Sequence, residues 1–511
     1  MSDRLDRLPR GRPNATSALA DRPDAPSRAH RPDPHNPSPF PLRPTPMSGS
    51  KETAMYIRTF IKPAISPRRP SARRIGALMS AAIVLLAGSG CGNGASGHRP
   101  TASSASCSPS KGKVNITYWG FGLTIKKQIA EFNRTHPHIN VTLKEVSGDE
   151  YQQLLNALKA GTAPDVGQLD YADLPSFRLV NGLRDISACP GVAQIKDKVV
   201  PWTWSQVTFG GSGVYAIPQN VAPLGLYYRK DVFAKYGLPV PKTWADYYTV
   251  AKTLRAKDPS AHISSFSSGD ALLLMGLMWQ NGSRPFKYEG SSLAVNLLEN
   301  QSRQVMDYWQ KMVDEHLVDS GVQLFTPAAS KKLDDGSLAT VIAADWFRAY
   351  LPLNAPKAKG KWAVASLPQW DTSKVAGANF GGGTAAVLAG SKHPAEAAEF
   401  AAWLTTSDTA QREMIAQGGT TAAVAGQQRP EIDDAFPYYG GQRILHTFVD
   451  AAKTVDPRFQ WPPNWATAKA SLGDALTSAL NGKGTIASDF QQAQSKIIAD
   501  LKSRGVDVKA G

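Results

Sequence analysis

The sequence predicts an α/β fold. Strand and helix patterns alternate between residues 114 and 170, and this order requires parallel strands joined by helical crossovers. The chain has 511 residues, of which 42% are hydrophobic and 12 are Trp, so it can build two or three domains with large cores. In such sheets ligands bind beyond the carboxyl ends of the strands, so we expect site residues there.

The first strand and helix follow from side-chain periodicity. Residues 114–119 (VNITYW) are β-branched and aromatic, which is typical of a strand. Within residues 123–137, three apolar side chains fall on one helical face, Ile125, Ile129 and Phe132. Because Pro137 cannot continue a helix, the helix should end near it.

The next three elements repeat this order. Residues 139–146 alternate apolar and polar side chains as in a strand, and residues 151–161 predict a second helix that ends at a glycine. Residues 163–170 (APDVGQLD) predict a short third strand. Trp119 and Asp170 then stand at the carboxyl ends of strands, where a ligand would lie.

The net charge of +15 is concentrated near the N-terminus. Residues 1–90 carry 15 Lys and Arg against 6 Asp and Glu, which leaves 42 against 36, a net of +6, for the rest of the chain. Such a small excess is typical of a solvated surface, so we expect no nucleic-acid binding.

Residues 1–54 do not have the composition of a folded domain. Residues 1–50 contain 11 Pro and lack the apolar side chains that offset chain-ordering entropy. We therefore expect a disordered or untranslated extension, with Met47 or Met55 as the true start.

Residues 55–91 carry an export signal. A basic stretch precedes an apolar run of 13 residues at 75–87, which is too short to span a bilayer comfortably. Small residues and Cys91 follow, in a pattern that resembles a bacterial lipoprotein signal, although Gly88 stands where such signals usually carry a Leu-like residue. We expect a signal peptide with lipidation of Cys91. The alternatives are an ordinary signal peptide cut nearby and a short buried helix.

The two other cysteines predict a disulfide. Residues 92–111 are rich in Ser and Gly and predict a flexible tether. Lipidation of one of the three Cys leaves Cys107 and Cys189. Export favours a disulfide between them, and two buried free thiols are the alternative. The cysteine spacings show no metal-site pattern, so we expect no metal.

Several segments resemble, in order, one protein family. They are ITYWGFG at 116–122, EFNRTHPHINV at 131–141, YQQLLNALKAGTAPDVGQLD at 151–170, YAIPQNVAPLGLYYRKDVFAKYGLPVPKTWADY at 215–247, GSLATVIAADW at 336–346, ANFGGGTAAVLAGSKHPAEAAEFAAWL at 378–404 and WPPNW at 461–465. Together they are similar to the extracellular solute-binding proteins of family 1, the sugar-binding lipoproteins of ABC transporters that include maltose-binding protein.

The resemblance implies a two-lobed fold like that of periplasmic binding proteins, with a ligand cleft between the lobes. The chain would cross between the lobes near residues 220–223 and 379–383, where glycines suit a hinge. The implied lobes are residues 112–221 with 380–440, and residues 222–379 with 441–511.

The resemblance also implies a function. The protein would be a monomer, lipid-anchored at the extracellular face of the cell membrane. It would capture a sugar or oligosaccharide and deliver it to the permease subunits of an ABC importer, without a cofactor.

Sugars present flat apolar faces to aromatic rings and hydroxyls to carboxylates and amides. By motif position, the resemblance places ligand contacts at Trp119, Asp170, Tyr171, Asp173, Asn220, Asp270, Trp346, Asn379, Gly382, Trp461 and Trp465. Core packing is the alternative for each Trp, and helix capping is the alternative for Asp170 and Asp270. Trp244 and Trp309 fit amphipathic helices and are expected in the core.

The sequence shows no catalytic set. It contains neither an H-E-x-x-H nor a G-x-S-x-G motif, so we expect no enzyme. Asp170 and Asp270 resemble the paired acids that a glycosidase requires. An exported polysaccharide-active glycosidase is therefore the first alternative, and a glycan-binding adhesin is the second.

Overall fold

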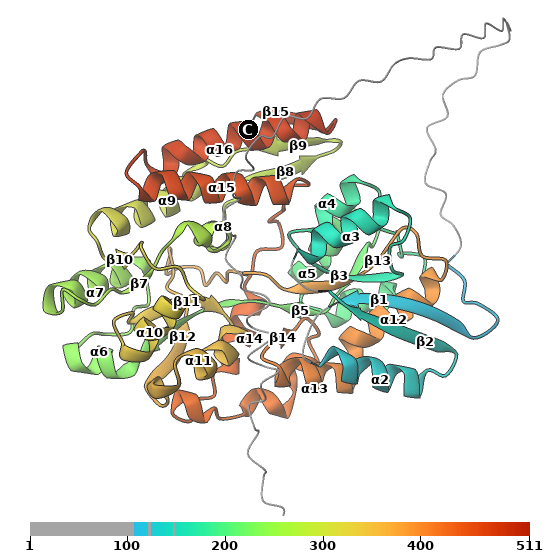
Figure 1. The fold of residues 1–511 in the computed structure, drawn as a ribbon, viewed down its shortest axis with the longest axis horizontal. Helices are drawn as coiled ribbons and strands as arrows, with labels where there is room; N and C mark the ends of the chain where they lie inside the picture. Colours follow the sequence, from blue (N-terminus) through green and yellow to red (C-terminus); the bar gives the residue numbers. More distant parts are fainter. Residues whose placement is uncertain (1–106, 121–123, 147–148, 511) are drawn as a thin grey trace, which may run out of the picture. The chain divides into compact units, whose positions relative to one another are not determined.

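The computed structural model describes residues 107–120, 124–146 and 149–510 (Figure 1). The predicted N-terminal extension, the signal peptide with Cys91 and the tether up to residue 106 lie outside the described residues. Within the described part of the chain, no helix is long and apolar enough to cross a membrane.

Lobe one is built on a mixed five-stranded sheet in the order β2-β1-β3-β13-β4. Its strands are β1 (Val114–Gly120), β2 (Ile139–Glu145), β3 (Val166–Asp170), β4 (Ala216–Pro218) and β13 (Gly383–Val387). As predicted, β1 pairs in parallel with β2 and β3, whereas β13 is antiparallel to β3 and β4. The chain re-enters this lobe at the edge where β3 ends, so β13 has to run the opposite way.

Helices pack on both faces of this sheet. On one face, Phe132 and Phe400 bring α2 and α12 together, with ring centroids 4.9 Å apart. On the other face, Leu154 of α3 packs against Gly167 of β3. The helical segments of the lobe are α2 (Ile125–Thr135), α3 (Glu150–Lys159), α4 (Leu174–Leu179), η1 (Ala193–Lys198), α5 (Pro201–Thr208), α12 (Pro394–Thr406) and α13 (Asp408–Ala416).

The predicted stops and faces of the first helices are confirmed. Ile125, Ile129 and Phe132 are each at most 6% exposed. The α2 helix ends two residues before Pro137. After α3, Gly161 takes φ +67°, a left-handed backbone that glycine adopts without steric cost and that ends a helix.

Lobe two combines three small sheets with a helical layer. Its strands are β6 (Leu224–Arg229), β11 (Thr340–Ala344) and β12 (Trp362–Ser366) in an antiparallel sheet ordered β11-β6-β12, β7 (Ser264–Ser265) paired with β10 (Val318–Asp319), and β8 (Phe286–Glu289), β9 (Ser292–Val295) and β15 (Asp507–Ala510). Its helical segments are α6 (Lys230–Tyr236), α7 (Trp244–Lys257), η2 (Ser268–Asp270), α8 (Ala271–Gln280), α9 (Asn300–Asp314), α10 (Pro327–Asp335), α11 (Phe347–Asn354), η3 (Pro356–Ala358), α14 (Leu445–Lys453), α15 (Trp465–Leu480) and α16 (Ile486–Ser503).

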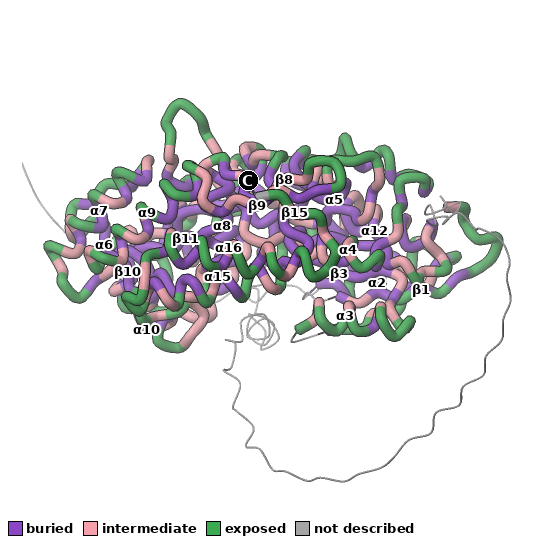
Figure 2. Tube along the Cα trace, turned by 90° about the horizontal axis from the view of Figure 1, so that it is seen from above, coloured by how far each residue is buried: buried purple, intermediate pink, exposed green. Residues whose placement is uncertain are grey.

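The α8 helix forms the centre of the helical layer. Every residue of α8 except Leu272 is buried (Figure 2), because it is apolar around its whole circumference. The predicted core tryptophans are confirmed, since Trp244 is 2% exposed and Trp309 is fully buried.

The two expected crossings lie side by side. The Phe380 N–H donates to the Ala222 carbonyl at 2.8 Å, and the Leu224 N–H donates to the Ala378 carbonyl at 2.9 Å. A third segment joins them, because β14 (Thr420–Thr421) pairs with β5 (Asn220–Val221).

The chain then leaves lobe one through three short 3-10 turns, η4 (Gly426–Gln428), η5 (Pro430–Asp433) and η6 (Pro437–Tyr439). The last of these already contacts lobe two. The Tyr439 hydroxyl donates to the Arg348 carbonyl at 3.0 Å, and the Gly360 N–H donates to the Tyr438 carbonyl at 2.7 Å.

Cys107 and Cys189 form a disulfide, the pair that the sequence predicts, with Cα atoms 4.8 Å apart. The bridge ties the first described residue to lobe one across a sequence separation of 82 residues. Among the described residues, no group of three or more His, Cys, Asp and Glu side chains could hold a metal ion.

Candidate functional site

The crossing segment at residues 380–383 links the predicted residues of the two lobes. At one end, the ring of Phe380 stacks on that of Trp346 in lobe two, with centroids 6.0 Å apart. At the other end, Gly383 pairs with Asp170 at the carboxyl end of β3. The segment therefore forms a floor between Trp346 and Asp170, which lie in different lobes.

A hollow with a volume of about 50 Å³ opens beside this floor in lobe two. It is lined by Ser267, Gly269, Asp270, Leu273, Gln323, Leu324, Phe325, Ile342, Ala343, Trp346 and Phe380. Two of the predicted ligand residues, Asp270 and Trp346, are therefore brought together. A larger hollow of about 450 Å³ lies between α6 and the ends of α7 and α10, but none of the predicted residues lines it.

Three aromatic rings form one wall of the hollow. The ring of Trp346 is half-buried and lies between those of Phe325, at 5.8 Å and 36°, and Phe380, at 6.0 Å and 30°. Aromatic faces of this kind match the apolar faces of a sugar ring.

Sequence reasoning missed Phe325. Its φ is +70°, a left-handed backbone that non-glycine residues adopt at a cost and that is often found at functional sites. The available signal was a large aromatic residue in the loop segment GVQLFTP, directly before the Thr326 cap of α10.

Asp270 is both a cap and a wall residue. Its Oδ2 accepts hydrogen bonds from the Ser267 N–H at 2.6 Å and from the Ser267 hydroxyl at 3.0 Å, so the helix-cap alternative holds in part. The side chain is half-buried and also lines the hollow. Burial raises the pKa of Asp270 to about 6, and the two bonds from Ser267 oppose that rise.

Lobe one carries an acidic group at the carboxyl end of β3. Asp170 and Asp173 are half-buried, and the many protein atoms around them desolvate both carboxyls. Burial raises the pKa of Asp170 to about 6, although a hydrogen bond from Tyr151 lowers it. Burial, and next the charge of Asp170, raise the pKa of Asp173 well above its usual value.

Lys469 of α15, in lobe two, faces this acidic group and lowers the pKa of both Asp170 and Asp173. Neither Lys469 nor Tyr151 was predicted from the sequence, because Lys469 lies outside the segments that resemble the family and Tyr151 stands in a segment that predicts only a helix. Each becomes a candidate only when the fold brings it next to Asp170.

Trp119 stands at the end of β1, as predicted, and is half-buried. The Lys144 ammonium lies 3.6 Å from the centre of its ring. One face of this indole is therefore occupied by a cation–π contact with the neighbouring strand.

For Trp461 and Trp465 the structure shows core packing, which was the alternative to the predicted ligand contact. Both are 3% exposed and pack in the core, with ring centroids 4.7 Å apart. Trp461 also lies 5.0 Å from Phe459 and 6.2 Å from Trp279 of α8. The apolar surface of α8 takes up these rings, so they do not cover a ligand in this arrangement.

Tyr171 and Asn220 lie at the hinge. Tyr171 is 2% exposed, and its hydroxyl donates to the Asn220 carbonyl at 3.2 Å. The Asn220 Oδ1 accepts from the Gly383 N–H at 2.9 Å, so its side chain joins the two crossings.

Asn379 and Gly382 have hinge roles as well. Asn379 is 1% exposed, accepts from the Ala222 N–H at 2.9 Å and donates to the Gly381 carbonyl at 2.7 Å. Gly382 takes φ +87°, and a Cβ there would lie 3.0 Å from the Asn220 carbonyl oxygen, so only glycine fits without a shift.

The fold and the order of its elements have clear relatives. Residues 120–411 match the profile of the bacterial extracellular solute-binding proteins. The chain belongs to this family.

The matches to individual relatives extend over most of each relative's length. The lactose-binding protein of Rhizobium radiobacter is 25% identical over 378 residues, which are 68% of this chain and 85% of the relative. The galacto-N-biose-/lacto-N-biose I-binding protein of Bifidobacterium longum, solved with lacto-N-biose, is 28% identical with a TM-score of 0.69 and covers 78% of this chain and 100% of that one. The ABC-transporter-associated binding protein of B. animalis subsp. lactis, solved with beta-1,6-galactobiose, is 29% identical with a TM-score of 0.67 and covers 77% and 99%. All three are binding proteins.

Proposed function

We propose that this solute-binding protein captures a sugar or short oligosaccharide outside the cell and delivers it to an ABC importer. The observation that carries this proposal is the hollow that brings the aromatic rings of Trp346 and Phe325 together with the carboxylate of Asp270. The rings offer apolar faces and the carboxylate offers an acceptor for sugar hydroxyls, and we propose that Asp170 of lobe one supplies a second acceptor. The sugars named for the related binding proteins support the same ligand class.

The proposed mechanism is capture by lobe closure, without chemistry. Asp170 belongs to lobe one and Trp346 to lobe two, so a sugar that contacts both binds the closed arrangement more tightly than the open one. Its differential affinity shifts the population toward closure. An importer can then distinguish a loaded protein from an empty one.

We further propose that the protein acts as a monomer held at the extracellular face of the membrane by lipid on Cys91. The apolar run at 75–87 followed by small residues and Cys91 supports this anchor. Replacement Cys91→Ser should release the protein into the medium, whereas continued retention at the membrane would contradict the anchor.

The ligand class is tested by thermal unfolding with a sugar panel. The panel contains lactose, beta-1,6-galactobiose, lacto-N-biose, an arabinooligosaccharide and a maltooligosaccharide, with a polyol and a dipeptide as controls. A sugar that binds only the folded protein raises its Tm by mass action. The sugar is recovered afterwards and checked for cleavage. A Tm increase with intact sugar supports a binder, cleavage supports a glycosidase, and a response to the dipeptide alone refutes the sugar class.

A further inference from the structure

The larger hollow of lobe two is a groove at the far end of the β11-β6-β12 sheet. It is lined by side chains from residues 229–236, 258–261 and 335–337, where β6 ends and where the chain runs from α10 into β11. Leu224, at the opposite end of β6, adjoins the crossings, because its N–H donates to the Ala378 carbonyl. The groove therefore lies away from the crossings, beside α6 and α7 (Figure 1).

The groove has the size of a small-molecule site. Its volume of about 450 Å³ falls within the range of about 300–1,000 Å³ that is usual for ligand pockets. The hollow beside Trp346, at about 50 Å³, is much smaller in this structure. A molecule the size of one sugar ring can therefore be accommodated in the groove.

Arg229 lies at the base of the groove. It is 1% exposed, and its Nε and Nη2 donate to the two carboxylate oxygens of Asp231 at 2.8 and 2.7 Å. Its Nη1 donates to the carbonyls of Leu333 and Asp334, in the last turn of α10, at 2.9 and 3.3 Å. Each Nη atom of a guanidinium carries two hydrogens, and the second hydrogen of Nη2 has no partner among the described residues. One donor of this buried guanidinium is therefore left for a molecule in the groove.

Two carboxylates stand where helices end at the groove. Asp258 follows α7, and its Oδ1 accepts from the N–H and the hydroxyl of Ser260 at 3.0 and 2.6 Å. Asp335 ends α10, and its Oδ1 accepts from the N–H and the hydroxyl of Ser337 at 2.9 and 2.7 Å. The bonds from Ser260, and next the bond from Tyr236, lower the pKa of Asp258 to about 2, so this carboxyl is ionised at neutral pH. The Oδ2 of Asp335 has no hydrogen-bond partner in the described part of the chain and can accept a further bond.

Lys235 of α6 supplies further donors. Its Nζ donates to the Tyr236 hydroxyl at 2.6 Å, and that hydroxyl donates to the Asp258 Oδ2 at 2.6 Å. An ammonium has three N–H groups, so two of them remain. The ion pair of the groove joins Arg229 and Asp231, and among the described residues no opposite charge lies within ion-pair distance of Lys235, Asp258 or Asp335.

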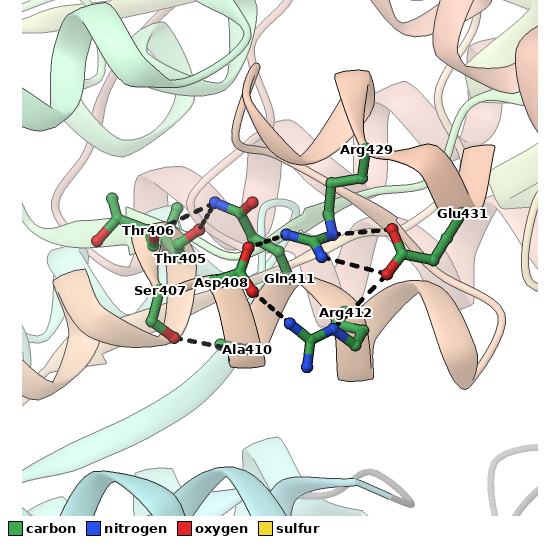
Figure 3. Close-up of polar contacts among 9 residues, drawn as sticks. All are labelled: Thr405, Thr406, Ser407, Asp408, Ala410, Gln411, Arg412, Arg429 and Glu431. Atoms are coloured by element: carbon green, nitrogen blue, oxygen red, sulfur yellow. Dashed lines mark hydrogen bonds and ion pairs between the residues drawn. The ribbon is translucent and has the colours of Figure 1, made fainter. Parts of the chain in front are cut away.

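A charged cluster elsewhere on the surface shows the contrast. Beside α13, Asp408 pairs with both Arg412 and Arg429, and Glu431 pairs with the same two arginines (Figure 3). Each charge in this cluster has opposite charges beside it, so the cluster is complete without a ligand. The groove instead keeps free donors and free acceptors around an open volume.

The mixture of free groups selects a class of ligand. Three carboxylates and the C-terminal ends of α7 and α10 oppose an anion, and Arg229 with Lys235 opposes a cation. No group of three or more His, Cys, Asp and Glu side chains in the described ranges could hold a metal ion. A sugar hydroxyl both donates and accepts hydrogen bonds, so neighbouring hydroxyls of one ring can bind an acceptor such as Asp335 and a donor such as Lys235 together.

We propose that this groove is a second carbohydrate site, which binds one neutral sugar unit through its hydroxyls. Asp335 accepts from the sugar, while Lys235 and the free N–H of Arg229 donate to it. The proposal rests on the volume and the free groups of the groove and does not depend on the proposed site at Trp346.

The test records saturation-transfer difference NMR spectra with D-galactose and D-glucose as probes, on the full chain carrying Cys91→Ser. We expect a signal from at least one sugar that persists in Trp346→Ala. Asp335→Asn keeps an Oδ1 acceptor for Ser337 but removes the charged acceptor for the ligand, and should weaken binding about tenfold. Ser260 is exposed at the rim, so Ser260→Trp should fill the groove and abolish the signal.

A matched control is Asp371, which forms the same kind of turn outside the groove. Its Oδ1 accepts from the Ser373 N–H at 2.8 Å, so Asp371→Asn repeats the chemical change of Asp335→Asn and should leave the signal unchanged. No signal from either sugar would overturn the proposal. So would a signal that is lost in Trp346→Ala but kept in Asp335→Asn and Ser260→Trp. If the oligosaccharide panel fails at the cleft, the groove signal should remain, so the failures of the two sites are distinguishable.

Discussion

The ring of Trp346 in lobe two stacks on the ring of Phe380 in the crossing segment, with centroids 6.0 Å apart and planes at 30°. Phe380 is also held to the first crossing, because its N–H donates to the Ala222 carbonyl at 2.8 Å. The principal aromatic wall residue of the cleft therefore rests on the hinge, so a change at the hinge is transmitted to the wall.

The first prediction concerns Trp346. Trp346→Ala removes a stacking face and should weaken sugar binding by about 1–3 kcal/mol, a roughly tenfold to hundredfold loss of affinity. The variant should remain folded because Trp346 lines a hollow and is only half-buried. Isothermal titration with the best sugar of the panel measures the loss.

Trp309→Ala is the matched control. Trp309 is fully buried and stacks on Phe266 at 4.6 Å, so its removal should lower the free energy of unfolding by about 3–5 kcal/mol. The sugar affinity of the folded fraction should stay unchanged. If Trp346→Ala instead behaves like Trp309→Ala, then Trp346 is a core residue and the site assignment fails.

The second prediction concerns pH. Burial raises the pKa of Asp170 and Asp270 to about 6 each, above the ordinary value of 3.8. Between these values, the folded ligand-free protein binds more protons than the unfolded chain. The stability that these carboxyls contribute is therefore fully present below pH 3.8 and is lost as the pH rises through 6. Sugar hydroxyls donate best to ionised carboxylates, so sugar affinity should change in the opposite direction and increase through pH 6.

Titration calorimetry and thermal unfolding between pH 4 and 8 test both trends. Asp170→Asn with Asp270→Asn should flatten the affinity profile and weaken binding at pH 7. An affinity that is constant from pH 5 to 7 in the wild type would show that these carboxylates do not accept bonds from the sugar.

The sequence predicted those parts of the fold that local patterns determine. The buried face of α2, the parallel pairing of β1 with β2 and β3, and the core positions of Trp244 and Trp309 all follow from periodicity or amphipathic spacing. The antiparallel direction of β13 does not follow from any local pattern, because it depends on the edge at which a distant segment of the chain re-enters the sheet.

The site was predicted unevenly for a similar reason. Motif position predicted ligand contacts at Trp346 and Asp270, and both line one hollow. Motif position alone could not distinguish a tryptophan that lines a hollow from one in the core, since Trp461 and Trp465 were also predicted as ligand contacts and are buried. Whether an indole faces a cleft or α8 depends on tertiary packing. Lys469 lies close to Asp170 only because α15 packs in lobe two near the cleft, and no local pattern records that.

The third prediction concerns the disulfide. Loss of the bridge through Cys107→Ser with Cys189→Ser should lower the free energy of unfolding by about 2–5 kcal/mol, because an unfolded chain without the bridge has more conformational freedom. Cys189 packs with the cluster around α2 and α12, whereas Trp346 lies in lobe two, so sugar affinity should not change. Denaturant unfolding measures the first effect and calorimetry the second. Unchanged stability would show that the bridge does not form in the exported protein.

The last prediction separates the two consequences of Phe325. Its side chain lines the hollow beside Trp346, and its backbone has φ +70°. Phe325→Ala and Phe325→Gly both remove the ring, so both should weaken sugar binding to a similar extent. Alanine keeps a Cβ in the left-handed region and glycine does not, so the Gly variant should be more stable than the Ala variant by about 1–2 kcal/mol. Thermal unfolding compares the two variants and titration calorimetry measures their affinities. Equal stabilities would mean that the loop relaxes out of the left-handed conformation once the ring is gone. Wild-type affinity in both variants would mean that the sugar contacts Trp346 without Phe325.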